Sequence, residues 1–161
     1  FLDLLSEMMP FNTELLVKEH PMHIGEYGMQ RLSKLVKREN IQLLDPRLNP
    51  KEILDKIDLL ITVNSTTGFE AILKKKPVVV LGDAWYNVLD LAFDVDDVEE
   101  IPSLINKAIQ YTPDENNILK LIGYTMESTY NGVPPAVRRD DKNVDDYCKN
   151  FMSVIKEKVT G

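Results

Sequence analysis

Short runs of consecutive apolar residues alternate along the chain with segments in which apolar residues recur every three or four positions. These runs occupy residues 15–17, 41–44, 59–63, 77–81 and, more briefly, 91–93, and only Gln42 and Thr62 interrupt them. The periodic segments carry apolar residues within 4–9, 27–36, 53–57, 69–73 and 101–109. A continuous run is typical of a strand that is covered on both faces, and a three-to-four spacing is typical of an amphipathic helix. The alternation predicts an α/β domain, a Rossmann-like parallel sheet of about five strands with helices on both faces.

The end of the chain follows a different pattern. Apolar residues spaced as on one helix face predict a long last helix over 144–159, after a break rich in Asn, Gly and Pro at 131–135. We therefore expect one domain over 1–161, with an α/β core in 1–110 and a mainly helical tail in 111–161.

Charge and composition exclude several classes of function. The formal net charge is -7, which disfavours non-specific binding to nucleic acid or to an anionic membrane. No run approaches the ~18 apolar residues of a membrane span. Cys148 is the only cysteine, so an internal disulfide is impossible and a reducing, cytoplasmic compartment is expected. The chain starts with neither Met nor a basic signal sequence, which suggests a piece of a larger protein.

Polar residues gather in the loops that follow the predicted strands. In an open parallel sheet, ligands bind beyond the carboxyl ends of the strands, so the sequence nominates the loops 19–21, 45–46, 64–68 and 82–86. The predicted ligand-binding residues from these loops and the helix that follows the third are Glu19, Asp45, Asn64, Ser65, Thr66, Thr67, Gly68 and Glu70.

The loop 64–68 is the most informative of the four. It joins a buried strand directly to a helix, so its N–H groups lie at a helix N-terminus, which favours an anion such as phosphate. Three hydroxyls and one amide add donors, and Gly68 would let a ligand approach the backbone. The alternative is a capping box made by Thr67 and Glu70, which needs no ligand. Glu70 would otherwise hold a ribose hydroxyl.

His20 is the predicted catalytic residue. Because it follows a strand and precedes Pro21, its imidazole should project at the sheet edge, where it could donate to a phosphate oxygen or act as a general acid. His23 completes an H-x-x-H pair that lacks a third ligand, so we expect no metal. Asp45 would contact a ribose or base, or simply cap its turn. Trp85 and Tyr86 would stack on a base or, more in keeping with such pairs, pack in the core.

The order and spacing of four segments resemble the capsule polysaccharide biosynthesis family, which includes bacterial Kdo transferases. These segments are VKEHP (17–21), LDP (44–46), NSTTGFEA (64–71) and KPVVVLG (76–82). The resemblance covers roughly residues 10–110. It implies the C-terminal, donor-binding half of a two-domain glycosyltransferase of the B-type fold, which binds a nucleotide sugar, commonly a CMP-linked acidic sugar, without a metal or other cofactor.

On this resemblance His20 belongs to a His-Pro motif that faces the donor phosphate, and Ser65, Thr66 and Thr67 form the phosphate-binding hydroxyl loop. Glu70 would be a nucleotide contact. The acceptor, a glycan or glycolipid, would bind through an N-terminal domain that this chain does not contain, so the longer protein rather than this chain alone is the expected enzyme. A nucleotide-sugar epimerase, a polyol-phosphate polymerase and a non-catalytic nucleotide-binding or scaffolding module remain alternatives.

Overall fold

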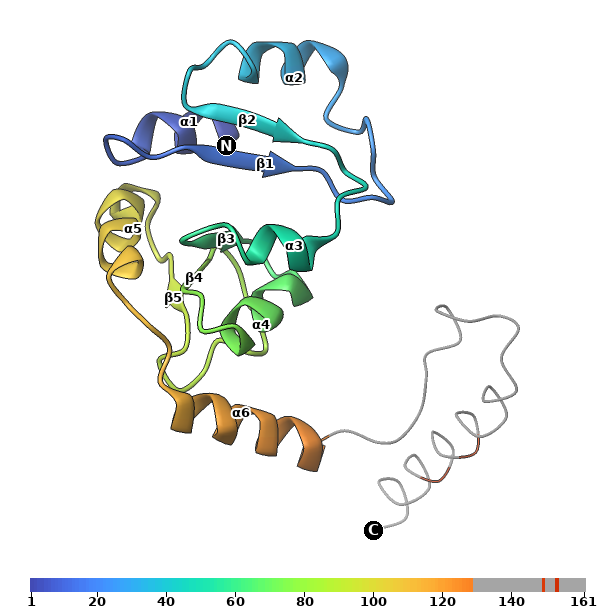
Figure 1. The fold of residues 1–161 in the computed structure, drawn as a ribbon, viewed down its shortest axis with the longest axis vertical. Coiled ribbons are helices and arrows are strands. Elements are labelled where there is room, and N and C mark those ends of the chain that lie inside the picture. The colour runs from blue at the N-terminus through green and yellow to red at the C-terminus, as the bar shows by residue number, and fades with distance from the viewer. Residues whose placement is uncertain (129–148, 150–152, 154–161) are drawn as a thin grey trace. The chain divides into compact units, whose positions relative to one another are not determined.

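The computed structural model describes residues 1–128, together with Lys149 and Ser153 (Figure 1). The chain divides into two compact units, 1–119 and 120–161. The described helices and strands are, in chain order, α1 (Leu2–Met8), β1 (Leu15–Lys18), α2 (Met29–Leu35), β2 (Ile41–Leu44), α3 (Pro50–Leu54), β3 (Leu60–Thr62), α4 (Thr66–Leu73), β4 (Val78–Val80), β5 (Phe93–Asp94), the 3-10 turn η1 (Val98–Glu100), α5 (Ile101–Ile109) and α6 (Glu115–Ser128). The predicted alternation of strands and helices is confirmed. The predicted last helix lies outside the described residues, except for Lys149 and Ser153, which are helical.

Every strand pair in the described structure is parallel, but the strands form two sheets. In the first sheet β1 pairs with β2, with Leu15 opposite Ile41. In the second sheet β4 lies between β3 and β5, with Leu60 opposite Val78 and Val79 opposite Phe93. The expected continuous sheet of about five strands is therefore not observed, because no hydrogen-bonded ladder joins β1 to β3.

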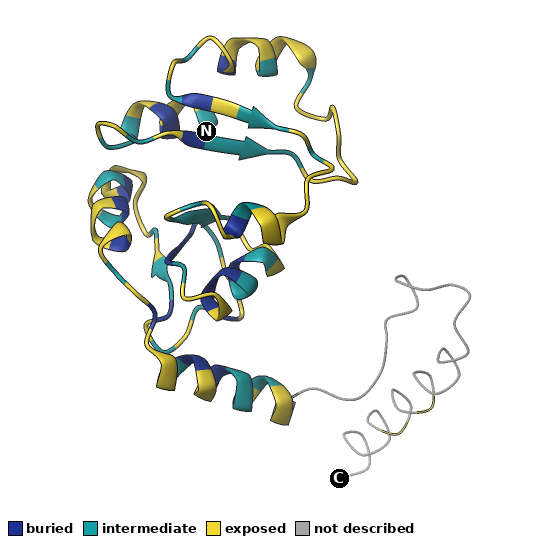
Figure 2. Cartoon of the chain, viewed as in Figure 1, coloured by how far each residue is buried: buried dark blue, intermediate teal, exposed yellow. Residues whose placement is uncertain are grey.

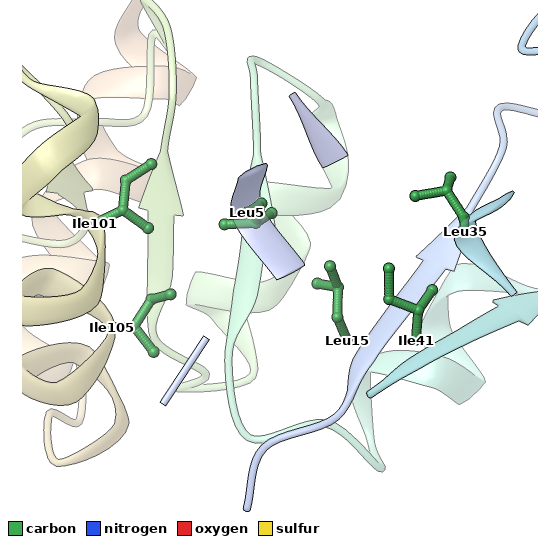
Figure 3. Packing of buried hydrophobic residues seen from close by; sticks show 6 residues of the cluster. All are labelled: Leu5, Leu15, Leu35, Ile41, Ile101 and Ile105. Atoms are coloured by element: carbon green, nitrogen blue, oxygen red, sulfur yellow. The ribbon is translucent and has the colours of Figure 1, made fainter. Parts of the chain in front are cut away.

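Apolar side chains, rather than backbone hydrogen bonds, connect the sheet of β1 and β2 with the sheet of β3, β4 and β5. One cluster includes Leu15 from β1 and Ile101 and Ile105 from α5, and Ile61 of β3 packs against it. Figure 3 shows Leu5 of α1 between the two isoleucines of α5 and Leu15. The two sheets of the first unit thus share a hydrophobic core without sharing backbone hydrogen bonds, and burial of that core is the main force that stabilises it.

The three-stranded sheet has the most deeply buried strand. Val78, Val79 and Val80 of β4 are almost inaccessible to solvent, as expected of a central strand that is covered on both faces. In Figure 2 the buried positions of α5 gather on the side that faces the strands and its other side is largely exposed. The positions of α4 that are not buried are mostly half-buried. Because β4 is buried, it fixes the position at which the loop 82–86 begins.

Candidate functional site

The loop 64–68 connects β3 directly to α4, and a serine caps the helix. Ser65 is the N-cap residue, and its Oγ accepts a hydrogen bond from the Thr67 N–H at 3.2 Å. The same Oγ lies 3.2 Å from Thr67 Oγ1, and the Ser65 N–H donates to Thr62 Oγ1. We call residues 64–68 the hydroxyl loop. Its hydroxyl groups lie at the positive end of the α4 dipole, a position that stabilises negative charge.

The cap differs from the one that the sequence pattern suggested. A capping box would place Thr67 at the N-cap and Glu70 three residues later. Because α4 begins at Thr66, Thr67 is instead the second helical residue and Gly68 the third. Glu70 is half-buried in the next turn, outside the position that a capping carboxylate takes. The capping-box interpretation is therefore wrong, and a ligand contact by Glu70 stays a prediction.

Gly68 has a packing role that the sequence did not reveal. A Cβ at this position would lie 2.1 Å from Tyr86 Oη and 2.4 Å from Tyr86 Cζ, so the ring fits only because residue 68 has no side chain. Tyr86 is fully buried, and its hydroxyl donates to the Ser65 carbonyl oxygen at 2.8 Å. Burial raises the pKa of this phenol, so it stays neutral and keeps donating. Buried Tyr86 therefore anchors the backbone of the hydroxyl loop at Ser65.

Of the two aromatic residues in the loop 82–86, Tyr86 follows the packing interpretation and Trp85 does not. Tyr86 is buried, whereas 53% of Trp85 is exposed. The only sequence signal for the contact between Tyr86 and Gly68 is a glycine in the first turn of a helix, and this signal does not identify the partner. Packing across two loops is a tertiary property, which periodicity along the chain does not encode.

His20 lies in a second loop, residues 19–28, which we call the histidine loop. Its imidazole is exposed, and Nδ1 accepts a hydrogen bond from the Met22 N–H at 3.2 Å. An accepting Nδ1 places the ring proton of the neutral imidazole on Nε2. Nε2 can then donate to an anion such as a phosphate oxygen.

Glu19 connects the start of the histidine loop with Gly25 through one hydrogen bond. Its Oε2 accepts a hydrogen bond from the Gly25 N–H at 3.2 Å, while Oε1 is inaccessible to solvent and has no partner among the described residues. His23, on the other side of the loop, contacts Glu26 through Nδ1 at 2.8 Å, and its ring centroid lies 5.3 Å from that of His20. The described residues contain no group of three or more His, Cys, Asp or Glu side chains that could hold a metal ion.

Asp45 closes the turn after β2. Both of its carboxylate oxygens accept hydrogen bonds from the Arg47 guanidinium, at 3.0 and 2.7 Å, and Oδ1 also accepts from the Arg47 N–H. These bonds hold the pKa of Asp45 at about 2. The geometry is that of a turn-capping carboxylate, and a ribose or base contact by this residue stays a prediction.

The predicted site residues follow the carboxyl ends of three of the strands. Residues 19 and 20 follow β1, Asp45 follows β2, and the hydroxyl loop follows β3. A pocket of about 490 Å³ lies instead beyond β4 and β5 and is lined by residues of 80–96. The loop 82–86, which the sequence nominated, contributes to this pocket. Base stacking by Trp85 or Tyr86, the alternative to core packing, was the ligand contact that the sequence suggested there.

Parallel strands, helices that follow them and polar residues at the strand ends define an α/β protein with a candidate anion-binding loop. A family model described as "Capsule polysaccharide biosynthesis protein" matches residues 1–119, most of the chain. The chain belongs to this capsule polysaccharide biosynthesis family, as the four ordered segments had indicated. No solved structure shows a significant match.

Individual relatives cover shorter parts of the chain. It is 34% identical over 73 residues to the capsule polysaccharide modification protein LipA of Neisseria meningitidis serogroup A, 45% of this chain and 10% of LipA. It is 30% identical over 92 residues to the capsule polysaccharide export protein KpsS of Escherichia coli, 55% of this chain and 24% of KpsS. A match to Protein FixF of Sinorhizobium fredii has 31% identity over 74 residues, 45% of this chain and 18% of FixF. The matched segments therefore span at most about a quarter of these relatives.

No helix among the described residues has the length and apolar character needed to cross a membrane.

Proposed function

We propose that this chain is the donor-binding part of a glycosyltransferase in capsule or other surface polysaccharide biosynthesis. The donor is a nucleotide sugar, and a CMP-linked acidic sugar of the Kdo type is our specific candidate. The observation that carries the proposal is the hydroxyl loop, in which a serine-capped helix N-terminus is held by a buried tyrosine. Membership of the capsule polysaccharide family supports the same class of reaction.

In the proposed reaction the hydroxyl oxygen of an acceptor attacks the anomeric carbon of the donor sugar. The bond from that carbon to the phosphate oxygen breaks, and its electron pair leaves with the nucleotide phosphate. The proton of the acceptor hydroxyl passes to a base or to water. Acceptor binding and that base belong, in this proposal, to the remainder of a longer protein that works in the cytoplasm, at the inner face of the membrane.

The residues of this chain would stabilise the charge that develops on the leaving phosphate. The N–H groups at the start of α4, the hydroxyl of Thr66 and Nε2 of His20 are the proposed donors, aimed at the charge that grows in the transition state. A hydrogen bond to a charged group contributes about 1.5–3 kcal/mol, so three of them would supply several kcal/mol. The proposal therefore needs no metal and no other cofactor.

Calorimetric titration of the chain with CMP, with UMP, UDP and ADP as comparison ligands, tests the proposal. We expect CMP to bind most tightly. Loss of the charge-assisted hydrogen bond from Nε2 should weaken CMP binding roughly 10- to 100-fold in His20→Ala. Ser65→Ala should weaken CMP binding as well, because it removes the cap that orders the start of α4. Ser33→Ala and His23→Ala are the matched controls, because Ser33 is an exposed serine on α2 and His23 lies in the same loop as His20.

Absence of CMP binding would count against the proposal, as would equal binding of ADP or equal losses in His20→Ala and His23→Ala. In the longer protein, His20→Ala should lower the rate of sugar transfer while the fold stays intact. Product analysis with and without an acceptor separates a transferase from an epimerase, since epimerisation needs no acceptor.

A further inference from the structure

A second candidate site lies beyond β4 and β5 and borders the hydroxyl loop, because Trp85 of its lining packs against Phe69, the residue that follows Gly68. Its pocket has a volume of about 490 Å³, within the range of small-molecule sites. The lining residues that concern us are Gly82, Asp83, Trp85, Asn87, Asp94 and Asp96. Val80, the last residue of β4, forms its floor, so the pocket opens at the carboxyl edge of a parallel sheet, where ligands of such sheets bind.

The charges in the pocket exclude an anionic ligand. Asp83, Asp94 and Asp96 contribute carboxylates, and no Lys, Arg or His belongs to the lining. The Asn87 side-chain amide donates to Asp94 Oδ1, which fixes that carboxylate. Asp83 and Asp96 have no hydrogen-bond partner among the described residues, so their oxygens are free to accept. The pocket therefore suits a ligand that carries several donors and no negative charge.

Trp85 adds an apolar platform to these acceptors. About half of its surface, 53%, is exposed, which is unusual for the largest aromatic side chain of the sequence. The ring is braced by Phe69, with centroids 4.9 Å apart, and meets Tyr86 edge-on at 5.5 Å. A braced and exposed indole offers a flat surface to a ligand that has an apolar face, and little conformational entropy is lost when that ligand binds.

We infer that this pocket binds an uncharged pyranose sugar unit. The ring C–H groups of a pyranose present an apolar face to Trp85, and its hydroxyls donate to the carboxylates of Asp83 and Asp96. A metal ion does not fit, because the described residues form no group that could ligate one. A nucleobase would also stack on the indole, but it offers few donors to three carboxylates. The inference does not depend on nucleotide binding at the hydroxyl loop.

The tryptophan makes the test direct, because Trp85 is the only tryptophan in the chain. Its fluorescence is recorded while the chain is titrated with the methyl pyranosides of glucose, galactose and N-acetylglucosamine, and with methyl glucuronide and cytidine. We expect a saturable change with at least one neutral sugar, at a millimolar dissociation constant. The glucuronide carries the glucose ring with one added carboxylate, so repulsion should weaken it roughly fivefold or more relative to the glucoside.

Variants separate the pocket from the rest of the surface. Asp83→Asn and Asp96→Asn should each weaken binding of the neutral sugar roughly three- to tenfold. They should also reduce the ratio of the affinity for the neutral sugar to the affinity for the glucuronide. Asp58→Asn removes one negative charge from an exposed residue outside the pocket and should change neither quantity. Circular dichroism checks that each variant is folded.

The inference is overturned if no neutral sugar of the panel changes the fluorescence, if the glucuronide binds as well as the neutral sugars, or if cytidine binds more tightly than all of them. A failure of CMP to bind in the calorimetric titration would leave this result unaffected, so the two proposals can fail separately.

Discussion

The hydroxyl loop and the histidine loop both follow a parallel strand and lead into a helix, yet they are held in different ways. The hydroxyl loop is short, its serine caps α4, and buried Tyr86 donates to its backbone. The histidine loop runs from Glu19 to Gly28 before α2 begins, and the side-chain hydrogen bonds within it lie among exposed groups. One loop is fixed by the core, and the other is fixed mostly by its own residues.

If both loops bind the donor phosphate, as we propose, this difference gives them different parts in binding. Donors on a loop anchored by a buried side chain keep their positions before a ligand arrives, so little entropy is lost on binding. A loop with few buried contacts opens at a lower free energy than the core of the same protein. We therefore expect the hydroxyl loop to provide a preorganised phosphate site, and His20 to take its final position when a ligand binds.

The largest effect is expected when the space between Gly68 and Tyr86 is filled. Gly68→Ala puts a methyl group 2.1 Å from Tyr86 Oη and 2.4 Å from Cζ, so the ring must move. Although Ala normally stabilises a helix by about 1 kcal/mol relative to Gly, overpacking here should lower the free energy of unfolding by about 1–3 kcal/mol. Urea denaturation measures the change.

Gly123→Ala is the matched control for that substitution. Gly123 lies in α6, and beyond the local backbone no described heavy atom lies within 4 Å of the position that the added methyl group would take. This variant should be as stable as the unsubstituted chain or up to about 1 kcal/mol more stable. Equal effects of the two substitutions would show that Tyr86 does not pack against Gly68.

A smaller effect is expected from removing the hydroxyl that anchors the loop. Tyr86→Phe keeps the buried ring and loses the hydrogen bond to the Ser65 carbonyl, which should cost about 0.5–1.5 kcal/mol of unfolding free energy. CMP affinity should fall as well, because the loop loses its anchor. Tyr111→Phe is the control, since Tyr111 donates to the Asp90 carbonyl, away from the loop. If both variants bind CMP equally well, the anchor has no part in binding.

Much of the fold was predictable from the sequence, because apolar runs and periodic spacing report burial along one element. The run 77–81 predicted the buried strand β4, and the stripe in 101–109 predicted the buried face of α5. The division into two sheets was not predictable, because it depends on whether β1 and β3 meet edge to edge. In the structure, side chains from α1 and α5, which lie far apart in the sequence, share a core with residues of both sheets, and such tertiary packing is not written in a local pattern.

The candidate site was predictable in its loops and not in its contacts. The strand-to-helix position of residues 64–68 follows from local pattern, and the structure has it there. The capping-box alternative was wrong because Ser65 and Thr67 are both acceptable N-cap residues, and the first helical residue decides between them. The exposure of Trp85 and the carboxylates around it result from the way in which residues of 80–96 fold back on one another, which a linear pattern does not record.

In the histidine loop, Glu19→Gln tests whether the carboxyl group of Glu19 lowers the free energy of unfolding. Oε1 of Glu19 is buried without a partner among the described residues, and an unpaired buried oxygen is destabilising, more so when it is charged. The amide of Gln retains one oxygen that can accept from the Gly25 N–H. We expect the free energy of unfolding to be unchanged or to rise by less than about 1 kcal/mol.

The control for this variant is Glu14→Gln, at an exposed position just before β1. Urea denaturation of the two variants in parallel gives the comparison. A clear loss of stability in Glu19→Gln alone would mean that the carboxylate stabilises the loop, and the contrast between the two loops would then be smaller than we infer.

The smallest effect concerns Asp45, whose ion pair with Arg47 is exposed to solvent. The hydrogen bonds from the Arg47 side chain are the main cause that lowers the pKa of Asp45 from 3.8 to about 2. Because the folded pKa lies below the unfolded value, the contribution to stability is present above pH 3.8 and is lost as the pH falls through 2. Carboxyl carbon NMR should therefore give Asp45 a titration midpoint near 2, and Arg47→Gln should return the midpoint toward 3.8.

High salt should also raise the titration midpoint of Asp45, but by less than Arg47→Gln does, since exposed charges are screened. A midpoint near 3.8 in the unsubstituted chain would mean that the pair does not form in solution, and it would leave the carboxylate of Asp45 free for a ligand.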